Sequence, residues 1–335
     1  MKKVTIRDIA REAGVSVATV SNVLNGVNKC KAETKQRVED IALKLGYKPN
    51  ISAKTLATRR SGLIGLVVHE DENRHQISHM NTLINGMSAA IRDHENYDLI
   101  ITEVFRGGSD DFLKDWITKR DLEGLIFIGD YEEELLGNVE KLSIPMVMVD
   151  NYNEEIVRAS YVHSEDTLGS YLAVEHLIEK GYKNIAFVSG NLEENEVYRR
   201  RFYGYKAAIE EYGLRLTEDN IFQTEEDFGS GYDITSEIIK NKEIDSIFFT
   251  YSEGALGALR YLNKNDVRVP EELGVISFGN LDAWEYTTPS LTSIDQQICH
   301  KGKIAVKMMM DKINKNTEYP REISIPVKII KRETT

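Results

Sequence analysis

The sequence has few of the residues that cross-link or anchor a protein. Its two cysteines, Cys30 and Cys299, lie far apart and show no metal-ligand spacing, so neither a disulfide framework nor a zinc site is predicted. No run of the ~18–20 apolar residues that a membrane-spanning helix needs is present. The basic start Met1-Lys2-Lys3 leads into charged residues, which argues against a secretory signal. We therefore predict a cytoplasmic protein that does not enter a membrane.

Signatures of catalysis are also lacking. The 7 histidines form no metal-ligand pair on one helix face, and no Gly-x-Ser-x-Gly or phosphate-loop run occurs. The acidic runs Asp110-Asp111 and Glu132-Glu133-Glu134 are typical of solvated faces. The prediction is a protein that is no enzyme and uses no cofactor and no metal.

The net charge of -12 argues against nucleic-acid binding when it is taken for the whole chain. Residues 1–60, however, hold 13 Lys+Arg against 5 Asp+Glu, a balance of +8. Residues 61–335 are left with 29 Lys+Arg against 49 Asp+Glu, a balance of -20. A small basic module therefore precedes a large acidic body, and a basic module is the electrostatic requirement for binding phosphates.

Residues 5–45 have the pattern of three short helices. Thr5 can cap a helix over 6–13, Gly14 breaks it, and Ser16 caps a second helix over 17–24; a third is predicted over 32–45. The first two helices are typical of a helix-turn-helix, although an ordinary helical hairpin has similar spacing. Short polar side chains on the outer face favour DNA binding, because they contact phosphates and base edges: Ser16, Thr19, Ser21, Asn22 and Asn25.

Beyond residue 62, apolar strands alternate with amphipathic helices. Strands are predicted at 63–68, 97–102, 124–128, 146–149, 184–188, 246–250 and 275–278, with helices such as 83–92, 169–180, 199–212, 231–240 and 255–263 between them. Continuous apolar strands separated by helices indicate parallel sheets covered on both faces. Because this many units exceeds one comfortable open sheet, we predict two doubly wound parallel-sheet subdomains.

Along its whole length the sequence resembles the lactose-repressor/galactose-repressor family of bacterial transcription regulators. The motifs that carry the resemblance include Asp8-Ile9-Ala10, Ala13-Gly14-Val15-Ser16, Ala18-Thr19-Val20-Ser21, Val23-Leu24-Asn25-Gly26, Leu45-Gly46-Tyr47-Lys48-Pro49-Asn50, Gly181-Tyr182-Lys183-Asn184-Ile185-Ala186 and Arg201-Phe202-Tyr203-Gly204-Tyr205. The resemblance implies an all-α helix-turn-helix DNA-binding head over 1–48, a hinge helix over 49–61 and a periplasmic-binding-protein-like α/β body over 62–335. Its first subdomain is expected at about 62–160 and 291–321, and its second at about 161–290 and 322–335.

In this family the second helix enters the DNA major groove, and the matching reader positions here are Val17, Ala18 and Asn22. Asn22 stands where arginine is most common. Because arginine pairs with guanine and asparagine with adenine, we predict a half-site changed at one base, unless Asn22 contacts only phosphate or water. Lys29 and Thr34 match positions that touch the sugar-phosphate backbone. The full predicted DNA-binding set is Thr5, Ser16, Val17, Ala18, Thr19, Ser21, Asn22, Asn25, Lys29, Thr34, Asn50, Ala53 and Leu56.

Residues 50–60 contain one small apolar face, formed by Ser52, Ala53, Leu56 and Ala57. The resemblance implies a hinge helix that forms on binding double-stranded operator DNA, pairs with its twin and inserts Leu56 into the minor groove. A flexible tether with a chance leucine is the alternative. Since the last residues, 331–335, show no apolar heptads, we expect a homodimer on a pseudo-palindromic operator rather than a tetramer.

The body is expected to bind a small-molecule effector, a carbohydrate or a derivative of one, between its subdomains at the carboxyl ends of the strands. Arg201 matches the family arginine that reaches sugar hydroxyls or carboxylates, with a solvated helix start as the alternative. Asp150 is expected to accept from a hydroxyl or to cap a turn. After Ser277-Phe278-Gly279 the usual carboxylate acceptor is missing, unless Asn280 or Asp282 takes its place. Tyr251 and Trp284 are expected either to stack on the ligand or to pack in the core.

Two further departures from the family pattern leave another interpretation open. Ser252-Glu253 stands where an Asn-Asp pair is usual, and a polar run, 69–76, replaces an apolar loop. In the alternative, a regulator of the same fold is controlled by a protein partner, such as a phosphocarrier protein, and the effector pocket is vestigial.

Overall fold

The computed structural model describes residues 4–24, 30–47, 60–69, 77–94, 96–104, 110–152, 156, 158–316 and 321–335. The chain divides into two compact units, Met1–Gly62 and Leu63–Thr335, here called the head and the body. Most of the segment predicted as a hinge helix lies outside the described residues. So do five of the predicted DNA-binding residues: Asn25, Lys29, Asn50, Ala53 and Leu56.

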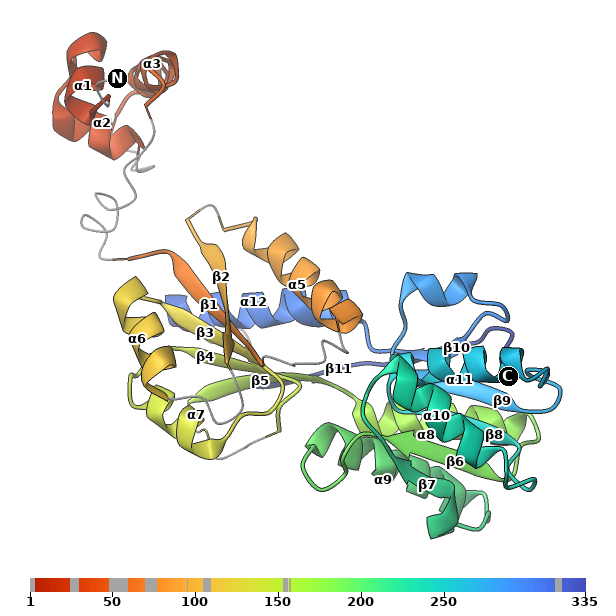
Figure 1. Cartoon of the computed structure of the whole chain (residues 1–335). Helices are drawn as coiled ribbons and strands as arrows, with labels where there is room; N and C mark the ends of the chain where they lie inside the picture. Colours follow the sequence, from red (N-terminus) through yellow and green to blue (C-terminus); the bar gives the residue numbers. More distant parts are fainter. Residues whose placement is uncertain are drawn as a thin grey trace. The chain divides into compact units, whose positions relative to one another are not determined.

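The head consists of α1 (Ile6–Ala13), α2 (Val17–Leu24) and α3 (Ala32–Lys44), drawn in red in Figure 1. α1 begins as predicted, because the backbone N–H and the hydroxyl of Thr5 both donate to the Asp8 carboxylate, at 3.0 and 2.7 Å. Gly14 ends the helix with φ +64°, a conformation that glycine adopts without a steric cost. The apolar stripes of the helices meet in one core: Ile9, Ala10, Ala13, Val20, Val23, Val38 and Ala42.

Two six-stranded sheets define the two lobes of the body (Figure 1). The first lobe has the strand order β11-β5-β4-β3-β1-β2. Its strands, all parallel, are β1 (Leu63–His69), β2 (Asp98–Val104), β3 (Gly124–Ile128), β4 (Met146–Val149), β5 (Ala159–Ser164) and β11 (Glu322–Ile325).

The second lobe has the strand order β12-β10-β9-β8-β6-β7. Its strands are β6 (Ile185–Ser189), β7 (Ile221–Gln223), β8 (Ser246–Phe249), β9 (Gly274–Phe278), β10 (Thr292–Asp295) and β12 (Lys328–Ile330). β12 runs antiparallel to β10, and the other pairs are parallel. All the strands predicted from apolar runs are present in the two sheets.

Helices cover both faces of each sheet. In the first lobe, α5 (Ile77–Ile91) and α12 (Ile298–Asn314) pack on one face, and α6 (Asp110–Arg120) and α7 (Glu133–Glu140) on the other. In the second lobe, α8 (Asp166–Glu179) and α9 (Glu196–Glu211) lie opposite α10 (Phe228–Ile238) and α11 (Ser252–Lys264). The predicted doubly wound α/β body is confirmed. Within the described ranges, none of the helices combines the length and apolar character of a membrane span.

The limits of the lobes differ from the predicted subdomain limits in three places, of which the first is β5, because its residues 161–164 were expected in the second subdomain but belong to the first lobe's sheet. β10 was expected in the first subdomain but pairs with β9 of the second lobe. β11 was expected in the second subdomain but pairs with β5 of the first lobe. Both strands are only four residues long, and their hydrogen-bonded neighbours rather than their apolar pattern determine which sheet they join. The chain therefore crosses between the lobes after β5, after β10 and after β11.

Candidate functional site

The start of α2 is organised by a side-chain cap. Ser16 Oγ accepts a hydrogen bond from the Thr19 backbone N–H at 3.0 Å and lies 2.9 Å from the Thr19 hydroxyl. Such a cap satisfies an amide that has no partner within the first turn of a helix. It also fixes Ser16 and Thr19, both predicted to contact DNA, at the N-terminal end of α2.

The outer face of α2 presents apolar and polar groups together. Val17 is 40% exposed and Ala18 is exposed, whereas Val20 is fully buried in the core. Ser21 and Asn22 are half-buried on the same helix. An exposed valine is unfavourable in water, but it can contact a thymine methyl while asparagine hydrogen-bonds a base edge. The described reader positions therefore share the exposed side of one helix.

The rest of the head supplies positive charge. Thr5 is exposed before α1, and Thr34 is half-buried in the first turn of α3, where its N–H donates to Lys31. Several basic side chains are exposed around them: Arg7, Arg11, Lys31, Lys35, Arg37 and Lys44. The ion pairs of Arg11 and Lys35, at 3.4 and 4.0 Å, lie on the surface, where such pairs contribute little. These cations can therefore exchange their partners for phosphates.

In the body, the guanidinium of Arg201 lies at the carboxyl ends of the second lobe's strands. The residue belongs to α9, is 7% exposed, and donates through Nε to Asp166 at 2.8 Å. Its terminal nitrogens donate to the Thr250 carbonyl at 2.6 Å and to the Gln296 side chain at 3.4 Å. The Phe278 ring lies 3.8 Å from the guanidinium carbon. Arg201 is therefore placed where doubly wound folds bind ligands, but its donors have partners within the protein.

Asp150, which directly follows β4, is paired with a buried lysine. Both of its carboxylate oxygens accept from Lys301 Nζ, at 2.7 and 2.8 Å, and the Lys301 side chain has 0% exposure. Burial raises the pKa of Asp150, but Lys301, His79 and Arg201 together lower it further than burial raises it. The carboxyl group expected to accept from a ligand hydroxyl is thus ionised and already holds an internal cation.

His79 on α5 is a neutral neighbour of this ion pair. Burial, followed by the positive charge of Lys301, lowers its pKa to about 4. The imidazole is therefore uncharged at neutral pH and has one donor and one acceptor nitrogen. Arg201 also lowers this pKa. His79, Asp150 and Lys301 from the first lobe and Arg201 from the second therefore form one electrostatic group, here called the inter-lobe cluster.

Three residues that bind Arg201 or Asp150, or that influence their charge, were not predicted from the sequence: Lys301, His79 and Asp166. A usable signal exists for Lys301, which interrupts the buried stripe of α12 formed by Ile298, Gly302, Ala305 and Val306. A lysine at a buried helical position requires a buried counter-charge. His79 and Asp166 carry no comparable signal, because each stands among ordinary helix-start or helix-face residues.

Both aromatic candidates are part of the second lobe's core. Trp284, in the short helix Asp282–Tyr286, is 5% exposed and donates from its indole N–H to the Gly279 carbonyl at 3.2 Å. Tyr251 is 4% exposed, and its hydroxyl contacts the Thr224 hydroxyl at 2.7 Å and the Glu225 carbonyl at 3.0 Å. Each ring was expected either to stack on a ligand or to pack in the core, and in the structure both rings pack in the core.

The two candidates for the missing acid differ in their exposure to solvent. Asn280 is half-buried, and its side-chain oxygen accepts from Arg332 at 2.9 Å and from Ser293 at 3.0 Å. Asp282 is exposed to solvent. Nearby, the Ser252 hydroxyl donates to the Gly279 carbonyl at 3.0 Å. The loop after β9 is therefore held by second-lobe contacts.

Glu253, at the start of α11, is a buried acid. It is 6% exposed, and burial, with a smaller effect of Glu226, raises its pKa to about 7. Within the described ranges, no group of three or more His, Cys, Asp or Glu is arranged to hold a metal ion. The carboxyl group is therefore a titrating group of the second lobe rather than part of a recognisable metal site.

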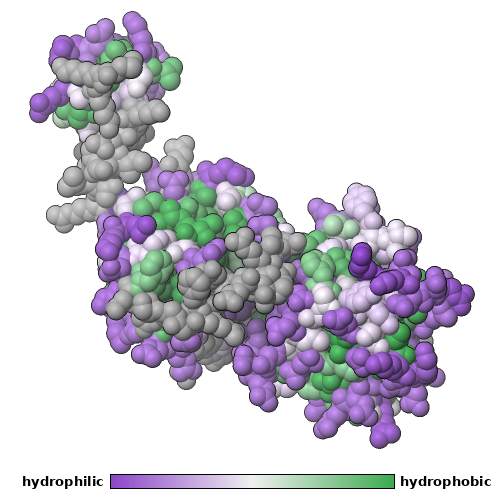
Figure 2. All heavy atoms as spheres, in the orientation of Figure 1, coloured by the Kyte–Doolittle hydropathy of each residue, from purple (hydrophilic) through white to green (hydrophobic). Residues whose placement is uncertain are grey.

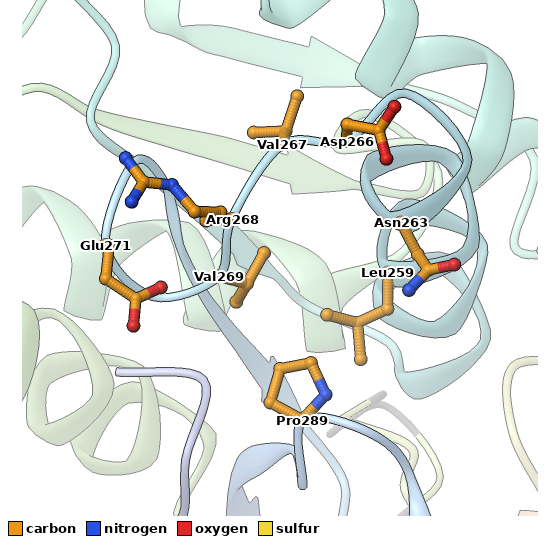
Figure 3. A pocket seen from close by; sticks show the side chains of 8 residues that line it. All are labelled: Leu259, Asn263, Asp266, Val267, Arg268, Val269, Glu271 and Pro289. Carbon is orange, nitrogen blue, oxygen red and sulfur yellow. The ribbon is translucent and has the colours of Figure 1, made fainter.

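A surface hollow of about 580 Å³ lies elsewhere on the second lobe (Figure 3). Leu259 and Asn263 of α11 form one wall, and the loop that precedes β9 forms the other, with Pro289 at its base. It is thus at the amino end of β9, whereas Arg201 lies at the carboxyl ends. None of the predicted effector residues lines this hollow.

The first lobe has an apolar surface of its own. Figure 2 shows a hydrophobic area on this lobe, near β2 in the orientation of Figure 1. β2 is an edge strand, and Ile101 on it is 51% exposed. An exposed apolar edge strand is unfavourable in an isolated molecule and is typical of an interface.

Comparisons with known proteins define the class of protein. Residues 5–50 match the model of the bacterial regulatory proteins of the lacI family, and residues 174–335 match the periplasmic binding protein-like domain. Catabolite control protein A of Priestia megaterium is 30% identical over 335 residues, which cover 99% of each chain. The chain belongs to the LacI family of bacterial regulatory proteins.

Solved structures agree with this assignment. A Lac repressor dimer bound to operator and the anti-inducer ONPF has a TM-score of 0.83 at 23% identity, covering 99% of each chain, and shows the same fold. A LacI family regulator from Enterococcus faecium with bound ribose has a TM-score of 0.71 at 26% identity, covering 82% of this chain and 98% of that one. The chain is therefore a DNA-binding transcription regulator and not an enzyme. Because such regulators act on bacterial DNA, the family agrees with the expected cytoplasmic location.

Proposed function

We propose that this regulator is a repressor whose affinity for operator DNA is set by a carbohydrate effector bound between the two lobes. The observation that carries the proposal is the inter-lobe cluster, in which charged groups of both lobes lie near enough at the carboxyl ends of the two sheets to shift each other's pKa. Fixed guanidinium, ammonium and carboxylate groups are the donors and acceptors that recognise sugar hydroxyls. The relative from Enterococcus faecium, which has ribose bound, supports a sugar as the class of effector.

For the DNA side we propose a homodimer in which each head, residues 1–48, reads half of a pseudo-palindromic operator. Val17, Ala18 and Asn22 face the base edges, and the basic side chains of the head contact phosphates. Residues 49–61 form the hinge, and the body, residues 62–335, forms the dimer, with the apolar edge at Ile101 as part of its contact. When bound to operator, the protein is associated with the nucleoid.

Thermal unfolding of the full chain tests the effector assignment. A panel of neutral sugars, phosphosugars and nucleosides is added separately, and one sugar or sugar derivative is expected to raise the Tm by several degrees. Arg201→Lys keeps the charge but loses the planar fork of donors, so it should lose this shift, whereas Arg260→Lys on the exposed face of α11 should keep it. A shift that persists in Arg201→Lys would place the ligand elsewhere.

A second candidate function is control by a protein partner, such as a phosphocarrier protein. One observation favours it: Arg201, Asp150, Asn280, Tyr251 and Trp284 all have partners within the body. Recognition groups that already have internal partners need no ligand to satisfy them. Stabilisation of the chain by a carrier protein, together with no response to the small-molecule panel, would support this alternative.

A further inference from the structure

The segment that follows β4 reaches from the first lobe to the second. Asp150 is held by Lys301, and the Asn151 side chain donates to the Gly129 carbonyl and the Asp130 carboxylate, both at 3.1 Å. Both of these anchors lie in the first lobe. Tyr152, the next residue, contacts both the last residue of β5 in the first lobe and the first residue of α8 in the second.

The Tyr152 hydroxyl donates to Asp166 Oδ2 at 2.7 Å, and the Ser164 carbonyl lies 3.2 Å from it. Asp166 is the first residue of α8 in the second lobe and is 2% exposed. Its other oxygen, Oδ1, accepts from Arg201 Nε at 2.8 Å. One buried carboxylate therefore joins a hydroxyl from the first lobe to the guanidinium of the effector site.

The ring of Tyr152 is contacted from both lobes, and its centroid lies 4.5 Å from that of His163 on β5. The guanidinium carbon of Arg200 lies 3.9 Å from the ring centroid, a cation–π contact. Burial and the neighbouring Asp166 raise the pKa of the Tyr152 hydroxyl, so it remains a hydrogen-bond donor at every physiological pH. The two consecutive arginines of α9 thus have different roles: Arg200 packs on the tyrosine, and Arg201 shares its carboxylate.

We propose that Tyr152 is a positioning residue of the effector site, which holds Arg201 through Asp166 and thereby couples the arrangement of the lobes to what Arg201 binds. This inference rests on the proposed function and adds the connection between the lobes. A ligand oxygen that takes a donor of Arg201 competes with Asp166, Thr250 and Gln296 for the guanidinium. Any resulting shift of Asp166 changes its hydrogen bond to Tyr152 and is thereby transmitted to the first lobe.

The test uses the full chain and operator sites selected from random DNA, with affinity measured by fluorescence anisotropy in the absence of added ligand. Tyr152→Phe removes the hydroxyl and keeps the ring. Tyr171→Phe is the matched control, because its hydroxyl also donates to a carboxylate, that of Glu211, at 3.1 Å but within the second lobe. Asp166→Asn serves as a second variant at the same connection.

We expect Tyr152→Phe to change operator affinity by fivefold or more and Tyr171→Phe to leave it within twofold. The double variant Tyr152→Phe/Asp166→Asn should have no larger effect than the stronger single one, because both interrupt one connection. An effect of Tyr152→Phe below twofold, or an equal effect of the control, would overturn the proposal. Should Tyr152→Phe unfold, the same comparison is made with Asp166→Asn.

The outcome is separable from that of the proposed function. If a sugar stabilises the chain but Tyr152→Phe binds operator normally, the role of Tyr152 is rejected and the proposed effector site is kept. If Tyr152→Phe changes the operator affinity but no small molecule has an effect, the role of Tyr152 is kept and the proposed effector site is rejected.

Discussion

The head and the body hold their predicted recognition residues in opposite ways. On α2 the reader positions Val17, Ala18 and Asn22 are exposed or half-buried around an apolar core. In the body, Arg201 and Asp150 are buried or nearly so, and each is bound to an oppositely charged side chain. In the proposed function, the head therefore presents its recognition residues before binding, whereas the body exchanges internal partners for ligand contacts. Recognition that requires such an exchange can be coupled to a change in structure.

The largest effect is expected from breaking the buried ion pair. Lys301→Met leaves the Asp150 carboxylate without its cation, and removing one partner of a buried pair destabilises by about 3–5 kcal/mol. Urea unfolding of the body should show this loss, whereas Lys303→Met, on the exposed face of the same helix, should change stability little. Equal stabilities of the two variants would show that the pair is not held as described.

The double variant Lys301→Met/Asp150→Asn tests whether the loss of stability comes from the unpaired charge. Because the buried charge is removed with its partner, we expect it to recover much of the lost stability. A double variant that is as unstable as Lys301→Met would assign the effect to packing at Lys301 rather than to charge.

A pH-dependent stability is expected for the body, because it contains a buried acid. Glu253 has a folded-state pKa of about 7, raised from 4.5, so the folded state binds this proton more tightly than the unfolded state. Its stabilising contribution is present below about pH 4.5 and is lost as the pH rises through 7. Glu253→Gln should therefore be more stable than wild type at pH 8, by about 1–3 kcal/mol, and nearly equal at pH 5.

The measurement is urea unfolding at the two pH values. Glu210→Gln, at an exposed position of α9, is the control and should follow the wild type at both. A Glu253→Gln variant that keeps the wild-type pH dependence would show that another group titrates in this range.

On the head, a change of specificity with little change of stability is expected. Asn22→Arg should replace a preference for adenine by one for guanine at a single half-site position, with discrimination of about 1–3 kcal/mol. Selection of binding sites from random DNA with both proteins measures this preference. Identical consensus sequences would mean that Asn22 contacts only phosphate or water.

The smallest effect is expected at the cap of α2. Ser16→Ala removes the acceptor for the Thr19 N–H and should destabilise the head by about 0.5–2 kcal/mol. Thermal unfolding followed by circular dichroism of the head's transition measures the loss. A body transition that shifts equally would contradict the division into independent units.

The two regions also differ in how far the sequence predicts them. The head's caps and apolar stripes are set by residues three or four positions apart, so Thr5–Asp8, Gly14 and Ser16–Thr19 were predictable. The same holds for the long apolar strands. The short strands β10 and β11 were not predicted as strands, and their residues were assigned to the wrong lobe, because pairing with distant strands decides their place.

The effector region was predicted only in part, for the same reason. Arg201 and Asp150 were identified by their places in motifs, but their counter-charges lie 35 and 151 residues away in the chain. No local pattern joins residues at such separations. Tyr251 and Trp284 fit a stacking or a core role equally well in sequence, and only the three-dimensional packing distinguishes the two.

The central claim is that a ligand held between the lobes of the body sets the DNA affinity of the head. It is tested most directly by measuring the operator affinity of the full chain while each sugar, phosphosugar or nucleoside is added. We predict that one sugar or sugar derivative changes the affinity tenfold or more and that Arg201→Lys abolishes the response. An operator affinity that stays constant with every compound, or a response that persists in Arg201→Lys, would contradict the claim.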